Sequence, residues 1–352
     1  MTRILAVRLD SDGDVLLTGP AIQALSRTGT VDLLASPSGA AAARLLPGVR
    51  TVIGFDAPWS GFRPPGVDTA ETLRLVETLR RNDYDRAAIF TSFHQSPLPM
   101  ALLARMAGIG FIVGTSVDYP GSLLDVRLKR PDPPGGGHEV EAALDVAVAA
   151  GATRPDRPRL AVRRPLPPVT ERLPATVRSA GYVVLHPGAS VPARGLRPDH
   201  AASIAAALAG AGHAVVVTGG PAERDLVGHT VAMARQQCPG ATLVDLAGAT
   251  DLAGLAAVLE AADCTVVGNT GPAHLSAAVG TPVVSLFAPV VPAERWRPYG
   301  VPVRLLGDQQ ASCRDSRARA CPVPGHPCLG GVSGAEVVAA VAELTHSSRG
   351  DT

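Results

Sequence analysis

Three carboxylates lie close together near the start of the chain. Residues 3–9 form a short apolar run typical of a buried strand, and Asp10, Asp12 and Asp14 follow it. A carboxylate at the end of a strand can attack a substrate, accept a proton or bind a metal ion, or it can simply cap the next helix. Gly13 allows close backbone approach and is a candidate phosphate-binding residue, and Asp14 beside it could take a proton from a sugar hydroxyl. Asp14 is therefore a candidate proton acceptor.

The same segment supports other interpretations of Asp10 and Asp12. A strand that ends in D-x-D-G resembles haloacid-dehalogenase-type phosphohydrolases, in which Asp10 would be the nucleophile and Asp12 the acid/base. Asp14 stands where that pattern usually has Thr. D-x-D also suggests a metal-bound sugar nucleotide. A calcium loop is disfavoured, because its twelfth position would be Ala21 rather than a bidentate glutamate. Capping of the following helix by Asp10 and Asp12 is the structural alternative.

A second segment with chemical potential spans residues 266–287. A β-branched run leads into Asn269, Thr270, Gly271 and Pro272, which predict a tight turn and then a helix with Thr270 as N-cap. A helix that starts at the carboxyl end of a strand presents free backbone N–H groups and a positive dipole end. We interpret this turn as a phosphate or pyrophosphate site. His274, one turn into the helix, could donate to a diphosphate oxygen or bond a nearby carbonyl, and we favour the first.

Strand-like and helix-like runs alternate along the rest of the chain, which predicts βαβ units and parallel sheets. The predicted fold is α/β with two Rossmann-like domains: residues 1–152, a linker at 153–177 and residues 178–352. The linker contains six prolines between residues 153 and 174. Pro20 predicts an irregular or kinked first helix. A ligand would bind in the crevice between the carboxyl ends of the strands. The runs in the first half are 31–35, 40–46, 51–55, 69–81, 86–93, 97–106, 111–114 and 139–150, and those in the second half are 182–186, 198–209, 214–218, 222–236, 243–246, 252–261, 301–306 and 335–344.

Composition narrows the functional class. The length of 352 residues favours two domains, and a net charge of +1 disfavours nucleic acid as the main partner. The sequence has neither a bilayer-length apolar stretch nor a recognisable leader, so we expect a cytoplasmic protein without a transmembrane segment. Five cysteines fit a reducing compartment. A G-x-G-x-x-G motif after the first strand of either half and a P-loop are both missing, which disfavours nicotinamide and P-loop enzymes.

The cysteines also bear on metal binding. Cys313, Cys321 and Cys328, with His326, are the only cluster that could bind zinc, but their spacing differs from the paired C-x-x-C of structural zinc sites. We therefore predict no metal site. Arg314, Arg317 and Arg319 give this loop positive charge, which could meet an acidic acceptor or be solvated, and Cys238 and Cys264 are predicted to be ordinary buried thiols.

Four motifs in order, and a fifth near the C-terminus, resemble the signatures of glycosyltransferase family 9, the ADP-heptose:lipopolysaccharide heptosyltransferases. The resemblance covers residues 3–344. The motifs are Gly13-Asp14-Val15-Leu16-Leu17-Thr18 with Pro20-Ala21, His186-Pro187-Gly188-Ala189-Ser190, Thr218-Gly219-Gly220-Pro221 with Glu223, Thr270-Gly271-Pro272-Ala273-His274-Leu275, and Gly325-His326-Pro327-Cys328.

The resemblance implies a GT-B fold and an inverting, metal-independent sugar transfer from a nucleotide diphosphate, favouring an ADP-sugar, with no cofactor. It makes Asp14 the general base, places Ser190 and Arg194 at the donor phosphates, and makes Glu223 an acceptor for ribose hydroxyls. Arg194 stands where many members carry Lys. The implied acceptor is a glycan, a glycolipid such as a lipopolysaccharide core, or a small molecule, and peripheral membrane contact is compatible with it.

Two observations set alternatives beside this interpretation. Many family members have Asp immediately before the Thr-Gly of the phosphate loop, whereas this chain has Asn269. That change motivates the alternative of a noncatalytic sugar-nucleotide-binding protein. Glu223 also lies in the first turn of a helix opened by Pro221, where the helix dipole favours a carboxylate without any ligand. His186, at a strand end, is interpreted as a hydrogen-bonded structural residue.

Overall fold

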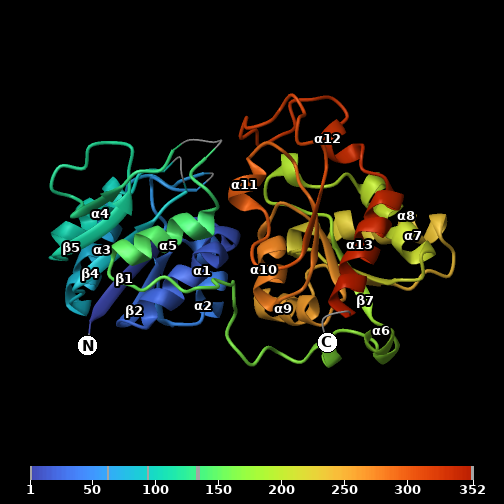
Figure 1. Ribbon diagram of the computed structural model, residues 1–352, viewed down its shortest axis with the longest axis horizontal. Coiled ribbons are helices and arrows are strands. Elements are labelled where there is room, and N and C mark those ends of the chain that lie inside the picture. Colours follow the sequence, from blue (N-terminus) through green and yellow to red (C-terminus); the bar gives the residue numbers. More distant parts are fainter. Residues whose placement is uncertain (1, 62, 93–94, 132–134, 350–352) are drawn as a thin grey trace. The chain divides into compact units, whose positions relative to one another are not determined.

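The computed structural model describes residues 2–61, 63–92, 95–131 and 135–349 and divides the chain into two compact units, Met1–Arg163 and Arg164–Thr352 (Figure 1). The division point lies inside the proline-rich segment 153–177. Each unit contains one six-stranded parallel sheet with helices on both faces.

The first unit has the strand order β3-β2-β1-β4-β5-β6. Helices α1, α2 and α5 pack together on one face, and α3 and α4 lie on the other (Figure 1). Leu5 and Val7 of β1 join Leu79 of α3 and Met100 of α4 in the core on that second face. The elements are β1 (Arg3–Arg8), α1 (Asp12–Ser26), β2 (Thr30–Ala35), α2 (Ala40–Leu45), β3 (Val49–Gly54), α3 (Thr69–Asn82), β4 (Arg86–Phe90), α4 (Leu98–Met106), β5 (Phe111–Thr115), β6 (Val126–Leu128) and α5 (Glu139–Ala149).

Local signals explain several of these boundaries. The side chain of Asp68 caps α3 by accepting from Glu71 N, and the helix ends at Asp83 in the left-handed conformation. Pro20 lies inside α1, which continues through it as one helix to Ser26. The predicted strand 86–93 ends at Phe90, and Phe93 lies outside the described residues.

The second unit repeats the arrangement with the order β12-β11-β10-β7-β8-β9. Helices α7, α8 and α13 cover one face through a large aliphatic core, and α9 and α10 pack together on the other (Figure 1). The elements are α6 (Ala175–Ala180), β7 (Tyr182–His186), α7 (Pro198–Gly210), β8 (Ala214–Val217), α8 (Arg224–Gln237), β9 (Leu243–Asp245), α9 (Leu252–Glu260), β10 (Cys264–Gly268), α10 (Gly271–Val279), β11 (Val283–Leu286), α11 (Ala293–Trp296), β12 (Val303–Leu306), α12 (Pro327–Gly330) and α13 (Gly334–Arg349).

Both sheets therefore have the doubly wound order, in which the direction of winding reverses beside the first strand. The reversal lies between β1 and β4 in the first unit and between β7 and β10 in the second. At such a point the loops after the two strands diverge and leave room for a ligand at the carboxyl edge. Sequence analysis missed β6, α6, α11 and α12. Within the described ranges, none of the helices has both the length and the apolar character that a membrane crossing requires.

Candidate functional site

A buried ionic cluster lies at the reversal point of the first unit. Arg8 is the last residue of β1 and pairs in register with Phe90 of β4. Its guanidinium forms an ion pair with Asp10 at 2.8 Å and donates to Ser92 Oγ at 2.9 Å. Gln95 donates to the other oxygen of Asp10 at 2.5 Å. Residues that follow β1 are thus tied to residues that follow β4, although 85 positions separate Asp10 from Gln95.

Asp14 lies in the first turn of α1, next to this cluster. One carboxylate oxygen accepts from Ser11 Oγ at 3.0 Å, and the other lies 3.3 Å from Arg8 Nη2. The side chain keeps 22% of its surface exposed, whereas that of Arg8 keeps 3%. A carboxylate that is partly open to solvent yet held by two donors suits a group that exchanges a proton with a substrate. The preceding residue, Gly13, is buried in the same turn.

Asp10 and Asp12 have structural partners that the sequence did not indicate. Asp12 Oδ1 accepts from Ala42 N at 2.8 Å and so caps α2 rather than α1, whose N-cap is Ser11. The structural alternative for Asp10 and Asp12, capping of the helix that follows them, is therefore wrong. Both oxygens of Asp10 are occupied by Arg8 and Gln95. Among the described residues, no group of three or more His, Cys, Asp or Glu side chains is arranged to hold a metal ion.

The burial of Asp10 makes stability depend on pH. Burial raises the pKa of Asp10 to about 6; Arg8 opposes this shift and Asp14 adds to it. Because the pKa of Asp10 is higher in the folded than in the unfolded protein, neutral Asp10 favours folding at low pH. This contribution to the free energy of unfolding is lost as pH rises through about 6. We expect Asp10→Asn to remove this fall, on the order of 2–3 kcal/mol between pH 4 and pH 7.

Urea unfolding of the parent and the variant across this pH range measures the effect. Trp59 packs against the core of the first unit, so a Trp296→Phe background lets its fluorescence report on that unit. Parallel stability curves for the two proteins would contradict the assignment.

In the second unit, β10 and α10 form the predicted phosphate turn. The helix begins at Gly271, with Thr270 at the N-cap and Pro272 in the first turn, as the sequence indicated. Beside it, the turn Pro192–Arg194 follows β7. A Cβ at Gly268 would lie 2.5 Å from the carbonyl oxygen of Arg194, so only glycine lets the two backbones meet. The structure thus brings the Arg194 backbone to the end of β10. Ser190 is exposed just before this turn, and His274 is buried in α10.

His186 and Glu223 lie together at the end of β7. His186 Nδ1 and Thr218 Oγ1 are 3.0 Å apart, and His186 Nε2 lies 3.7 Å from Glu223. Burial lowers the pKa of His186, and Glu223 opposes this shift. Glu223 Oε2 accepts from Gly220 N at 2.7 Å, so this carboxylate caps the helical turn that Pro221 opens. The other oxygen lies over Gly188, where a Cβ would approach it to 1.8 Å.

Asn269 holds the loop that follows β11. Its Nδ2 donates to Ala288 O at 3.2 Å, and its Oδ1 accepts from Ala288 N at 3.1 Å. The side chain is buried. A carboxylate could accept from the amide of Ala288 but could not donate to its carbonyl. The amide of Asn269, which stands where the family usually has Asp, thus links the end of β10 to the loop after β11.

This geometry predicts that Asn269→Asp is destabilising. The new carboxylate would face the carbonyl of Ala288 in a buried site, so we expect a loss of about 1–3 kcal/mol in the free energy of unfolding. The loss should be smaller at pH 5 than at pH 8, because a protonated carboxyl could donate to that carbonyl. Denaturant unfolding at both values, followed through Trp296 in a Trp59→Phe background, measures this difference. Equal stability of variant and parent at pH 8 would contradict it.

The cysteine-bearing loop after β12 holds the turn that carries Arg194. Ala193 N donates to the carbonyl of Arg319 at 3.0 Å, and Ala193 O lies 3.1 Å from His326 Nε2. Burial lowers the pKa of His326. Cys313 of this loop and Cys328 of α12 are buried, and all five cysteines are free. Cys264 is buried as predicted, whereas Cys238 is only partly buried. His326, grouped with the cysteines by sequence, thus has a backbone partner 133 residues away.

Comparison with known proteins agrees with this arrangement. Residues 72–326 match the model of glycosyltransferase family 9 (heptosyltransferase). A lipopolysaccharide heptosyltransferase 3 of Escherichia coli is 27% identical over 350 residues, covering 96% of this chain and 97% of the relative.

Two solved structures show the same fold. The E. coli ADP-heptose LPS heptosyltransferase II has a TM-score of 0.74 at 20% identity, covering 99% of this chain and 100% of the other. The E. coli heptosyltransferase WaaC with ADP has a TM-score of 0.68 at 19% identity, covering 97% and 99%. The two Rossmann-like domains expected of a GT-B enzyme are confirmed, and the phosphohydrolase alternative is wrong. With its family model matched over most of its length, this chain belongs to glycosyltransferase family 9, the heptosyltransferases.

Proposed function

We propose that this glycosyltransferase transfers a heptose or related sugar from an ADP-sugar to an acceptor hydroxyl, with inversion at the anomeric carbon and without a metal ion. The observation that carries the proposal is Asp14, a carboxylate held by Ser11 and Arg8 yet partly open to solvent at the reversal point of the first sheet. The acceptor would be a glycan, a glycolipid such as a lipopolysaccharide core, or a small molecule.

The proposed chemistry needs a base and a site for the leaving group. Asp14 would take the proton of the acceptor hydroxyl as its oxygen attacks the anomeric carbon opposite the diphosphate, which inverts the configuration. Arg194 and the N-terminus of α10 would stabilise the charge that develops on the departing diphosphate. Ser190, Asn269, Thr270, Gly271, Pro272 and His274 complete the proposed donor site, with Glu223 at the ribose. Asn269 would shape the site through its bonds to Ala288, so it does not favour the noncatalytic alternative.

A donor panel tests the proposal. Thermal shifts with ADP, UDP, GDP and CDP, and with their sugars, should give the largest stabilisation for ADP and an ADP-heptose. ADP release from that donor should then depend on an acceptor such as a deacylated lipopolysaccharide core. The rate should survive exhaustive dialysis against EDTA, and NMR of the product should show the inverted anomer. Thermal protection without ADP release for every acceptor would indicate a noncatalytic binder, and loss of rate in EDTA would remove metal independence.

A further inference from the structure

Arg8 is a buried cation that lies beside Asp14. Carboxylates from three elements face its guanidinium: Asp10 after β1 at 2.8 Å, Asp14 of α1 at 3.3 Å and Glu139 of α5 at 4.0 Å. Ser92, after β4, accepts from it at 2.9 Å. Because its side chain is 3% exposed, Arg8 cannot serve as a general substrate-binding cation on the surface. Its role must be exerted through the groups that surround it.

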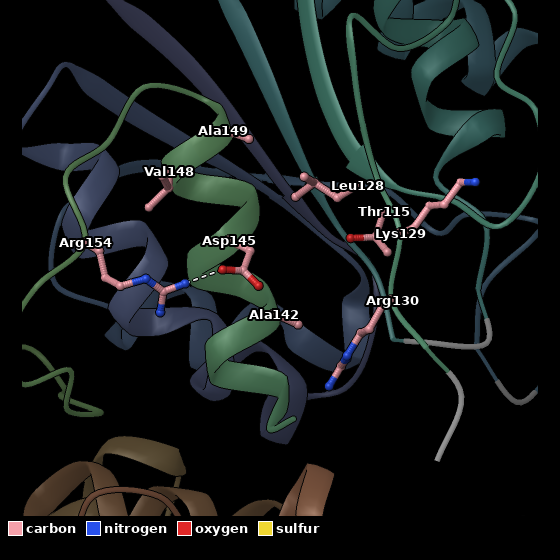
Figure 2. A pocket seen from close by; sticks show the side chains of 9 residues that line it. All are labelled: Thr115, Leu128, Lys129, Arg130, Ala142, Asp145, Val148, Ala149 and Arg154. Atoms are coloured by element: carbon pink, nitrogen blue, oxygen red, sulfur yellow. Dashed lines mark hydrogen bonds and ion pairs between the residues drawn. The ribbon is translucent and has the colours of Figure 1, made fainter. Parts of the chain in front are cut away.

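Glu139 extends the cluster away from Asp14. This residue opens α5, and its carboxylate accepts from Arg130 Nη1 at 2.6 Å. Arg130 also donates to the carbonyls of Gly136 and Gly137. Together with Lys129 it lines a pocket beside α5, and its side chain points toward the start of that helix (Figure 2). The series of contacts thus runs from Arg130, in the loop after β6, through Glu139 and Arg8 to Asp14, with cations and carboxylates alternating. These contacts tie Arg8 to α5 and to the loop after β6.

The three carboxylates that share Arg8 differ in exposure. The side chains of Asp10 and Glu139 are 10% and 2% exposed, and burial raises the pKa of both, whereas Asp14 is 22% exposed. The positive charge of Arg8 opposes both of these shifts. Asp14 is thus the member of the set that a substrate can reach.

We propose that Arg8 is a positioning residue for Asp14, which fixes the orientation of that carboxylate and favours its ionised form, while Glu139 and Arg130 hold Arg8 in place. The inference rests on the proposed role of Asp14 as the general base. A base must be unprotonated when the acceptor binds, so a fixed cation at 3.3 Å extends activity toward lower pH. Without Arg8, Asp10 and Glu139 would repel a further negative charge on Asp14.

The test compares pH profiles of kcat/KM for the parent, Arg8→Lys and Arg8→Met. Removing the cation should raise the pH below which kcat/KM falls, the acid limb of the profile, by about one unit. At pH values below this point, kcat/KM should be roughly tenfold lower than that of the parent. The loss should shrink above pH 8.5, and the affinity for ADP should stay within about twofold, because donor binding is assigned to the second unit. Arg8→Lys keeps a charge without the fork of donors, so it should shift the limb less.

A matched control comes from the same sheet. Arg50 forms an ion pair with buried Asp32, at a 2.9 Å contact, and Asp32 pairs in register with Leu5, three residues before Arg8 on β1. Arg50→Met should lower stability and leave the pH limb unchanged. If Arg8→Met does not fold, Arg8→Lys carries the comparison. An unmoved limb in the folded Arg8 variants, or a uniform loss at all pH values, overturns the inference. The proposed function fails separately, if Asp14→Asn retains turnover.

Discussion

Asp14→Asn should lower kcat by roughly 10²–10⁴-fold while the affinity for ADP stays within about twofold. Asparagine has almost the same shape as aspartate, and its Oδ1 can still accept from Ser11. It cannot take a proton from the acceptor hydroxyl. The loss would therefore be confined to the chemical step. Initial rates of ADP release at saturating donor and acceptor, together with calorimetric titration of ADP, separate the two quantities.

Asp12→Asn is the matched control for this experiment. Asp12 lies two residues earlier in the same turn, and its carboxylate accepts from Ala42 N. Replacing it by an amide should change stability slightly and leave kcat near that of the parent. Near-normal turnover in Asp14→Asn would remove Asp14 from the mechanism. Equal losses in both variants would mean that the turn, rather than the carboxylate of Asp14, is what activity requires.

The segment around α10 was predictable because its signals are local. A β-branched run, a polar turn with glycine and proline, and a helical period follow one another within 22 residues, and the structure has the strand, the turn and the helix start at Gly271 as expected. The long alternating elements were found for the same reason. The short elements β6, α6, α11 and α12 span three to six residues, too few for a period to distinguish them from loops.

The contacts of the site were not predictable, because they join residues far apart in the chain. Asp12 reaches Ala42, and Asp10 reaches Gln95 across the reversal of the sheet. Arg8 reads in the sequence as an ordinary residue of an apolar strand. One signal was present: a charged residue inside a run that is otherwise buried requires a partner. That reasoning identifies Arg8 as unusual, but the contacts with Ser92 and Glu139 become visible only once β4 and α5 are placed beside β1 and α1.

Arg194→Ala should weaken ADP binding and lower kcat/KM by roughly 10²–10³-fold, because a charge-assisted bond to phosphate is lost in both the bound donor and the transition state. The backbone of the turn should persist without this side chain. Ala193 is held by Arg319 and His326, and the carbonyl of Arg194 rests on Gly268. Arg194→Lys keeps the charge without the bidentate fork, so it should recover most of the affinity.

A second arginine variant shows whether Arg194 acts through a specific contact with the diphosphate or only through the net charge of the protein. Arg197, three residues later, is an exposed cation that pairs with Asp199 at the start of α7, and its replacement by alanine removes the same net charge. If Arg194 binds the diphosphate, Arg194→Ala should weaken ADP far more than AMP, and Arg197→Ala should weaken both slightly. Calorimetric titration of the two nucleotides against the three proteins measures this difference. Because the turn is fixed by its backbone, unchanged ADP affinity in Arg194→Ala would mean that the helix N-terminus at Gly271 holds the diphosphate without Arg194.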